Sequence, residues 1–516
     1  MSARPVNARP QNAREVKLGN YIAYGANDFL GAGAMSIIGV WILFFYTTYC
    51  GLTAAEAGII FVVARLLDAF FSPIIGYISD HFHHTWLGRK FGRRRFFILL
   101  AVPLVPSFAL MWVEGQSFWY YLITYCFFEL VYAMEIIPYE TLAAEMSPDY
   151  KTKAKFAGAR IICGQIANIA ALWLPGIIVA RLGGQESAVT FLYLGAVFSV
   201  FFVFVALAVY FFTWERPREE IPGHDKPPER SPFSNLTQLF EDLAATMRIR
   251  AFRLHLGMYL GGYISQDILN GVFAYFILFA LAGTVATTSD VTTVMAIAQL
   301  VSVIATIWLF VKLHPAPSYR IALLLFGSGV LGLLALYFGG ITDITWFFAV
   351  VAIAGLGRGA LNYIPWSVYN YMPDVDEIVT GRRREGAFAG VMTFVRKFMQ
   401  SVAIFAVSQI LDLAGLIPKS KTQPESVVDA VLWIMGFGVL AVLVIGFIVS
   451  LRFRLNSETH AVLMEEIDRF KTNPGTQPTP ENRAVVEDLT GWKYEELWGK
   501  GRQRRGFRRP LTSDNS

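Results

Sequence analysis

Long apolar segments recur along nearly the whole chain, and no other feature restricts its fold so strongly. Of the 516 residues, 55% are hydrophobic and only 16% are charged, and the mean hydropathy is +0.46. In a soluble protein about a quarter of the residues are charged, whereas about 20 apolar residues in a row suffice for a helix across a bilayer. The composition therefore predicts an integral membrane protein.

Twelve segments are apolar and long enough to span a membrane as helices. Between the sixth and the seventh lies a polar, Pro-rich linker, 215–250, which ends in a short amphipathic helix. We therefore predict an all-α membrane protein with 12 transmembrane helices in two six-helix halves, 20–214 and 251–452, flanked by tails at 1–19 and 453–516. The predicted helices are 20–49, 53–79, 96–113, 118–146, 155–182, 189–213, 252–283, 288–312, 320–340, 344–372, 384–416 and 427–451.

Lys and Arg residues are concentrated in the loops on one side of this topology. They gather in the N-terminal tail, at 88–95, at 151–155, in the linker and at 382–384. Short cytoplasmic loops of membrane proteins carry such an excess of positive charge. We therefore expect a multi-pass protein of the cytoplasmic (inner) membrane with both termini in the cytoplasm.

The two halves repeat each other. IPYETLAAEMSPDYKTKAKFAGAR (137–160) is similar to IPWSVYNYMPDVDEIVTGRRREGAFAG (364–390), and YGANDFL (24–30) is similar to YISQDIL (263–269). Repeated halves joined by a cytoplasmic linker are typical of secondary transporters, which bind their substrate near the bilayer midplane at the repeat interface. This organisation predicts a carrier.

Nothing in the sequence indicates an enzyme. The three cysteines lie in or beside apolar segments without metal-ligand spacing, and His81, His83 and His84 belong to a polar loop that we interpret as solvated. A phosphate-binding Gly-rich loop, which a primary pump would need, is missing from the sequence. We expect no catalytic residue, no metal site, no nucleic-acid partner and no cofactor other than a coupling ion, H+ or Na+.

Three dispersed motifs resemble a known family. They are DAFFSPIIGYISD (68–80), PYETLAAEMSPDY (138–150) and PWSVYNYMPDVDEIVTGRRREGAF (365–388). They are similar, in the same order, to the signatures of the glycoside–pentoside–hexuronide:cation symporters, the melibiose permease group of the major facilitator superfamily. The resemblance covers most of 18–452. It implies a monomeric carrier in membrane lipid that moves a small molecule, a sugar or glycoside, with a cation by alternating access.

Arg65 and Asp68 lie three positions apart in an apolar segment and so share a helix face. A charged residue at the bilayer centre costs roughly 2.5–3.5 kcal/mol on insertion scales, and it persists where it pairs or has a role. Position alone leaves a structural ion pair and a cation site equally open, and the resemblance favours the cation site. We therefore expect Asp68 to bind the coupling ion, with Arg65 offsetting its charge.

Ser72 stands where the family usually has a second acid. A single protonatable carboxylate suits a proton better than Na+, so we favour proton coupling and leave sodium and uncoupled transport open. Glu135 or Glu140 is a candidate for a second carboxylate. The predicted cation site therefore comprises Asp68, Ser72, Arg65 and Glu135.

The resemblance also implies a sugar site. Asp28 matches a sugar-binding acid and Lys397 a lysine near both sites, while Ile136 and Glu140 depart from the family pattern and indicate a substrate other than melibiose. The alternatives are a packing role for Asp28 and the aromatic residues, and for Arg160 a side chain that reaches the cytoplasmic interface. The predicted substrate-binding residues are Asp28, Tyr24, Tyr132, Glu140, Arg160, Trp366, Thr393 and Lys397.

Charged residues at the cytoplasmic helix ends resemble a gating network. We expect it to favour the outward-facing state if it forms only when the cytoplasmic side is closed; a basic loop that only sets topology is the alternative. Its predicted members are Asp80, Arg93, Arg94, Glu145, Asp376, Arg382, Arg383 and Glu385.

Other functions remain open at this point. A lysolipid or other amphiphile is an alternative substrate, and a transporter-like sensor that signals through 453–516 is an alternative of another class. The tail carries EEIDRFK and GWKYEELWGKGRQRRGFRR, which suit contact with the anionic inner leaflet. A disordered extension and a partner-binding segment are equally compatible with it.

Overall fold

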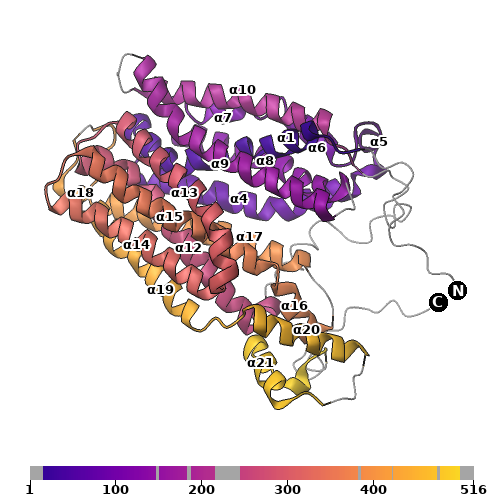
Figure 1. Cartoon of the computed structure of the whole chain (residues 1–516). Helices are drawn as coiled ribbons and strands as arrows, with labels where there is room; N and C mark the ends of the chain where they lie inside the picture. Colours follow the sequence, from indigo (N-terminus) through magenta and orange to yellow (C-terminus); the bar gives the residue numbers. More distant parts are fainter. Residues whose placement is uncertain are drawn as a thin grey trace. The chain divides into compact units, whose positions relative to one another are not determined.

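The computed structural model describes residues 15–146, 150–182, 187–215, 244–381, 385–420, 422–472 and 477–499, and every regular element in them is a helix. The chain divides into two compact units. Unit 1 is drawn from 1–235, 284–290 and 417–421, and unit 2 from 236–283, 291–416 and 422–516. Figure 1 shows the helices in chain order from indigo to yellow.

Eleven helices in the described part of the chain are long and apolar enough to cross a membrane. They coincide with eleven of the twelve predicted segments, which confirms a multi-pass, all-α membrane protein. Their apolar side chains lie both in the interior and on the outside; Trp119, Phe204 and Phe338, for example, are exposed. Outward apolar side chains are what a hydrocarbon solvent requires.

Unit 1 begins with a long run of α- and π-helical turns that ends at Gly51, whose φ of +82° stops the helix. A capping box follows, in which the Thr53 hydroxyl accepts from the Glu56 N–H at 3.1 Å and the Glu56 carboxylate accepts from the Thr53 N–H at 2.9 Å. The elements are α1 Leu18–Ala26, η1 Phe29–Gly33, α2 Ala34–Ile37, η2 Ile38–Ile42, α3 Leu43–Phe45, η3 Tyr46–Cys50, α4 Ala54–His81, η4 Phe82–His84, α5 Trp86–Phe91, α6 Arg95–Ala101, α7 Ser107–Leu110, α8 Phe118–Met146, α9 Tyr150–Arg181 and α10 Ala188–Phe212.

The third predicted span, 96–113, is wrong as a continuous helix. The chain there forms α6, a stretch of turns at 102–106, and α7. Pro103 and Pro106 lack the N–H that an α-helix needs. The N–H groups of Leu104 and Ser107 bond three residues back, to the carbonyls of Ala101 and Leu104, at 2.8 and 2.9 Å.

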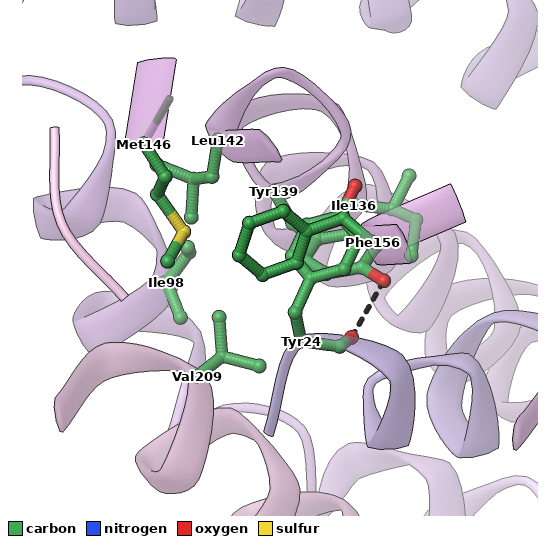
Figure 2. Packing of buried hydrophobic residues seen from close by; sticks show 8 residues of the cluster. All are labelled: Tyr24, Ile98, Ile136, Tyr139, Leu142, Met146, Phe156 and Val209. Atoms are coloured by element: carbon green, nitrogen blue, oxygen red, sulfur yellow. Dashed lines mark hydrogen bonds between the residues drawn. The ribbon is translucent and has the colours of Figure 1, made fainter. Parts of the chain in front are cut away.

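Within unit 1, α4 packs along α8, α1 along α9, and α10 along α6 and α7 (Figure 1). Figure 2 shows an apolar cluster in which the ring of Tyr24 from α1 stacks on that of Tyr139 from α8, with centroids 4.6 Å apart. The Tyr139 hydroxyl donates to the Tyr24 carbonyl oxygen at 2.8 Å. This cluster ties α1 to α8 where both carry the polar residues described below.

Unit 2 is built on α12, which packs against α15, α17 and α19, and on a close pair formed by α14 and α15. A Cβ at Gly357 would lie 2.3 Å from the Phe326 backbone nitrogen, so only glycine permits this approach. The elements are α12 Arg250–Tyr275, η6 Phe276–Ala280, α13 Val285–Leu313 (first turns in unit 1), α14 Pro315–Phe338, α15 Ile344–Tyr369, α16 Met372–Thr380, α17 Glu385–Leu413, α18 Glu425–Trp433, η7 Ile434–Val439 and α19 Leu440–Leu451.

The tail folds onto unit 2. Helices α20 (Ser457–Thr472) and α21 (Pro480–Thr490) both pack against α16, and η8 (Tyr494–Glu496) follows them (Figure 1). The Trp498 and Gly499 N–H groups each donate at 2.9 Å to the carbonyls of Ile378 and Val379. A disordered extension is therefore excluded for 457–472 and 477–499.

Candidate functional site

Asp28 forms the centre of a charged cluster in unit 1. Arg160 on α9 donates through Nε to Asp28 Oδ1 at 3.1 Å and through Nη2 to Glu140 Oε1 at 2.8 Å. A Cβ at Gly31 or Gly164 would lie 2.8 or 2.6 Å from a carboxylate oxygen of Asp28, so both glycines make room for this carboxylate. Three predicted substrate-binding residues from α8, α9 and the start of η1 thus lie together.

Glu135 lies fully buried on α8, beside this cluster. Its Oε2 accepts from Asn27 Nδ2 at 3.1 Å, and Asn27 is fully buried as well. Glu135 Oε1 has no hydrogen-bond partner within the described residues. Sequence reasoning missed Asn27, although its position immediately before Asp28 in an apolar span could have indicated it.

Arg65 pairs with an acid that was not among the residues expected from the sequence. Its Nη1 lies 3.2 Å from Glu129 Oε1 on α8, and its Nη2 donates to Met35 Sδ at 2.8 Å. Arg65 therefore forms its ion pair with Glu129, which α8 presents to this face of α4, and the charge of Asp68 also acts on Arg65. An acid in the apolar run CFFELVY was the signal that could have revealed it.

Asp68 is fully buried on α4 and accepts from the Ser72 hydroxyl at 3.0 Å, one helical turn away. The two residues predicted to form the core of the cation site are therefore in contact. Their geometry offers carboxylate and hydroxyl oxygens, which are suitable ligands for a hard cation or a proton.

The predicted aromatic residues of unit 1 pack in the core. Tyr24 is only 3% exposed, and Tyr132 packs against the same cluster (Figure 2 for Tyr24). Both aromatics therefore take part in packing, and their predicted contact with substrate stays a prediction.

The unit 1 part of the predicted gating network is present. Arg94 pairs with Asp80 and, at 3.2 Å, with Glu145, and Arg93 also pairs with Glu145. Sequence reasoning missed Glu215. Its carboxylate accepts from the N–H groups of Arg93, Arg94 and Arg95 at 3.0, 2.9 and 2.5 Å and so caps the start of α6. Burial raises the pKa of Glu215, against the lowering effect of these hydrogen bonds.

The unit 2 part of that network is only partly described. Asp376 is buried in α16 and accepts from the Thr380 hydroxyl at 3.5 Å. Arg382 and Arg383 lie outside the described residues, and Glu385 is the first residue of α17. The other acids of α16 bind the tail: Asp374 Oδ2 lies 2.9 Å from His460 Nε2, and Glu377 Oε1 lies 2.7 Å from Lys471 Nζ.

A second charged cluster lies in unit 2. Asp267 on α12 receives both Nη groups of Arg396 on α17, at 2.6 and 2.9 Å, and Gln400 Nε2 at 3.1 Å. The sequence favoured Lys397 and placed Arg396 elsewhere round the helix, and the ion pair of Arg396 with Asp267 was not expected. The repeat of YGANDFL in YISQDIL aligns Asp267 with Asp28 in the sequence, and this was the available signal. Thr393 is exposed, and Lys397 is half-buried.

Aromatic rings border the unit 2 cluster. The Arg396 guanidinium lies 4.9 Å from the Tyr263 ring centroid, and Trp366 Nε1 donates to the Tyr263 hydroxyl at 3.1 Å. Trp366 is 41% exposed.

The described residues contain no group of three or more His, Cys, Asp or Glu side chains that could hold a metal ion. Of the three loop histidines, His81 and His83 bond the carbonyls of Tyr77 and Asp80, at 2.9 and 3.1 Å.

Comparisons with known proteins agree with this picture. A family model described as MFS/sugar transport protein matches residues 23–457. A putative sulfoquinovose importer of Salmonella typhimurium is 25% identical over 90% of this chain and 96% of its own length. A glucuronide carrier protein homolog of Escherichia coli is 22% identical over 87% and 95%, respectively. The crystal structure of the nucleoside transporter NupG is 16% identical, covers 86% of this chain and 100% of its own, and has a TM-score of 0.56. This last similarity shows a shared fold.

Proposed function

Because the chain belongs to the family of MFS/sugar transport proteins, we propose that it carries a sugar or glycoside across the cytoplasmic membrane by alternating access, together with a cation. It is a transporter and not an enzyme. The observation that carries the proposal is the cluster of Asp28, Glu140 and Arg160 within apolar helices. The names of the relatives, a sulfoquinovose importer and a glucuronide carrier homolog, support a sugar-type solute.

Asp28 is the proposed acceptor for sugar hydroxyls. A carboxylate accepts hydrogen bonds on two oxygens at once, which suits two adjacent hydroxyls of a pyranose. Arg160 holds this carboxylate through Nε and can turn from Glu140 to the solute. In the other unit, Trp366 offers an exposed ring for stacking, with Tyr263 fixing its indole nitrogen. Both units therefore carry residues of the kinds that bind sugars.

Asp68 and Ser72 form the proposed cation site, and proton coupling is favoured over sodium. Asp68 accepts from Ser72, whereas Arg65 pairs with Glu129, so a proton or cation on Asp68 can exchange without breaking the Arg65–Glu129 pair. Glu135 is the proposed second acid, since one of its oxygens has no partner in the described part of the chain. Neither site requires a further cofactor.

The test is uptake into proteoliposomes containing the purified protein, with imposed proton or sodium gradients. A panel of glycosides, pentosides and hexuronates is offered to the wild type, Asp68→Asn and Asp343→Asn. Asp343 caps α15 outside the span, and Asn caps equally well, so this variant is the matched control. We expect one gradient to drive concentrative uptake, and Asp68→Asn to abolish accumulation while the control retains it.

Other outcomes discriminate the alternatives. Uptake that ignores both gradients and the Asp68 substitution would indicate an uncoupled facilitator. Absence of uptake for every sugar would contradict the proposal and direct the search to lysolipids and other amphiphiles.

A sensor is the second candidate function, because the tail is folded onto α16. Its test is a chain that ends at Arg452. If the protein is a sensor, this shortened chain should lose signalling, and neither form of the protein needs to transport a solute. Full uptake by the shortened chain would count against the sensor.

A further inference from the structure

We propose that Arg358 on α15 binds an anionic group of the transported solute, a carboxylate or a sulfonate, so that the solute class is acidic sugars. The inference rests on the proposed sugar transport and specifies its substrate class. It is carried by the surroundings of Arg358, by the ion pair that the neighbouring acid forms with another arginine, and by the charge balance of the surrounding helices.

Arg358 is a cation among neutral groups. Its Nη1 donates to Asn270 Oδ1 on α12 at 2.9 Å and lies 3.9 Å from Met295 Sδ on α13. Its Nε is buried and has no hydrogen-bond partner among the described residues. Among all residues that the structure describes, no carboxylate lies within 4 Å of the guanidinium nitrogens of Arg358.

The nearby acid is already occupied. Asp267 on α12 receives two guanidinium nitrogens of Arg396 at 2.6 and 2.9 Å, and the amide of Gln400 at 3.1 Å. Arg396 Nη2 donates to Asp267 Oδ1, and Arg396 Nη1 lies at ion-pair distance from Asp267 Oδ2, so two nitrogens of one guanidinium face this carboxylate. Asp267 is therefore committed to Arg396, and it affects Arg358 only as a more distant charge.

The helices around this site carry more cations than acids. Away from their first and last turns, α12, α13, α15 and α17 hold the cations Arg358, Arg396 and Lys397 and the acids Asp267 and Asp290. Within unit 2, α12 packs against both α15 and α17 (Figure 1). The cluster of unit 1 has the opposite balance, with Asp28 and Glu140 on one arginine.

An unneutralised arginine deep in a membrane protein is costly and is kept where it has a function. Arginine presents several N–H donors in a rigid plane that matches carboxylate-type anions. Arg358 retains partial exposure, so an anion can approach it, and the unpaired Nε is a donor that such a ligand can satisfy. A neutral sugar would leave both the charge and this donor uncompensated.

The experiment compares two solutes that differ only in this charge. Uptake of methyl β-D-glucuronide and methyl β-D-glucoside into proteoliposomes is measured for the full-length wild type, Arg358→Gln, Arg358→Lys and Arg320→Gln. Arg320 lies near the start of α14, where its Nε donates to the Ala316 carbonyl at 3.2 Å, so it serves as a matched loss of one positive charge. Thermal unfolding in detergent verifies that each variant is folded.

We expect the wild type and Arg320→Gln to prefer the glucuronide by about 10- to 100-fold, the range for one charge-assisted hydrogen bond. Arg358→Gln should reduce the preference to near unity, and Arg358→Lys should keep part of it. Equal uptake of both glycosides by the wild type, or an unchanged preference in folded Arg358→Gln, would overturn the inference while leaving sugar transport intact. Failure of both solutes to enter, if a wider panel of sugars also fails, would overturn the proposed function and this inference together.

Discussion

At the scale of single residues, two buried arginines pair with acids that are far away in the sequence. Arg65 pairs with Glu129, and Arg396 pairs with Asp267, across 64 and 129 residues of chain. Breaking one partner of a buried pair is costly because a desolvated charge remains. Each pair therefore restricts which helices can be neighbours.

Glu215 allows a prediction at this scale. Its pKa is raised by burial, so the native state binds the proton more tightly than the unfolded chain. The stability that Glu215 contributes should therefore fall as the pH rises from about 4.5, the value in the unfolded chain, through the raised native pKa. Relative to Glu215→Gln, the wild type should be less stable at pH 8 than at pH 5, as measured by thermal unfolding in detergent.

Glu215→Ala is the companion variant. It removes the acceptor from three backbone N–H groups at the start of α6, so we expect a loss of about 1–2 kcal/mol at pH 5 and a smaller loss at pH 8. A pH-independent difference between wild type and Glu215→Gln would contradict the assigned role of burial.

At the scale of elements, the tail forms a helical extension held on α16. The rings of Phe470 and Trp498 stack with centroids 5.3 Å apart and an interplanar angle of 4°. The backbone N–H groups of Trp498 and Gly499 donate to carbonyls at the end of α16. Inside the extension, Glu466 is buried and accepts from Arg469 at 2.9 Å and Asn482 at 3.1 Å. The tail is thus stabilised by its own contacts and by α16.

We expect Trp498→Ala to release the end of this extension. Loss of the stacked pair should cost about 0.5–1.5 kcal/mol beyond the lost burial. Limited proteolysis should therefore cut the tail several-fold faster than in the wild type. Trp433→Ala, which removes an outward-facing ring of α18 that is 69% exposed, is the control and should leave the cleavage rate unchanged. Equal cleavage rates for all three proteins would show that the stack does not hold the tail.

At the scale of the whole molecule, the network of Asp80, Arg93, Arg94 and Glu145 is the proposed conformational lock of the cytoplasmic side. If it forms only in the closed state, its loss shifts the population without changing solute contacts. Glu145→Gln removes the acid that both arginines share. We expect a change in the population ratio of about 5- to 30-fold, equivalent to 1–2 kcal/mol.

The measurement is a distance distribution between spin labels on the cytoplasmic helix ends, combined with solute binding. Glu145→Gln should enlarge the cytoplasm-open population and alter the transport rate, whereas Asp343→Asn should behave as the wild type. An unchanged distribution would reduce the network to a topology signal, the alternative that the sequence left open.

The sequence by itself determined the class of the molecule and most of its helices. A membrane span is defined by the hydropathy of about 20 consecutive residues, so the spans could be predicted from local sequence. The three motifs indicated the family. Even the broken third span was encoded locally, in Pro103 and Pro106, although hydropathy concealed it. Asp28, Glu140 and Arg160 were predicted to share one substrate site, Asp28 from the family resemblance and Glu140 as a departure from it.

Only the tertiary structure decided which charges meet and where the tail packs. Asp267 and Arg358 are single charges in apolar runs, and nothing local says whether the nearest opposite charge is one turn away or on another helix. That depends on helix packing, which brings Arg396 to Asp267 and leaves Arg358 with Asn270. Likewise, the hydrogen bonds of Trp498 depend on where α16 ends. Ionic and backbone partners are chosen by proximity in space, and proximity between helices is a property of the folded chain.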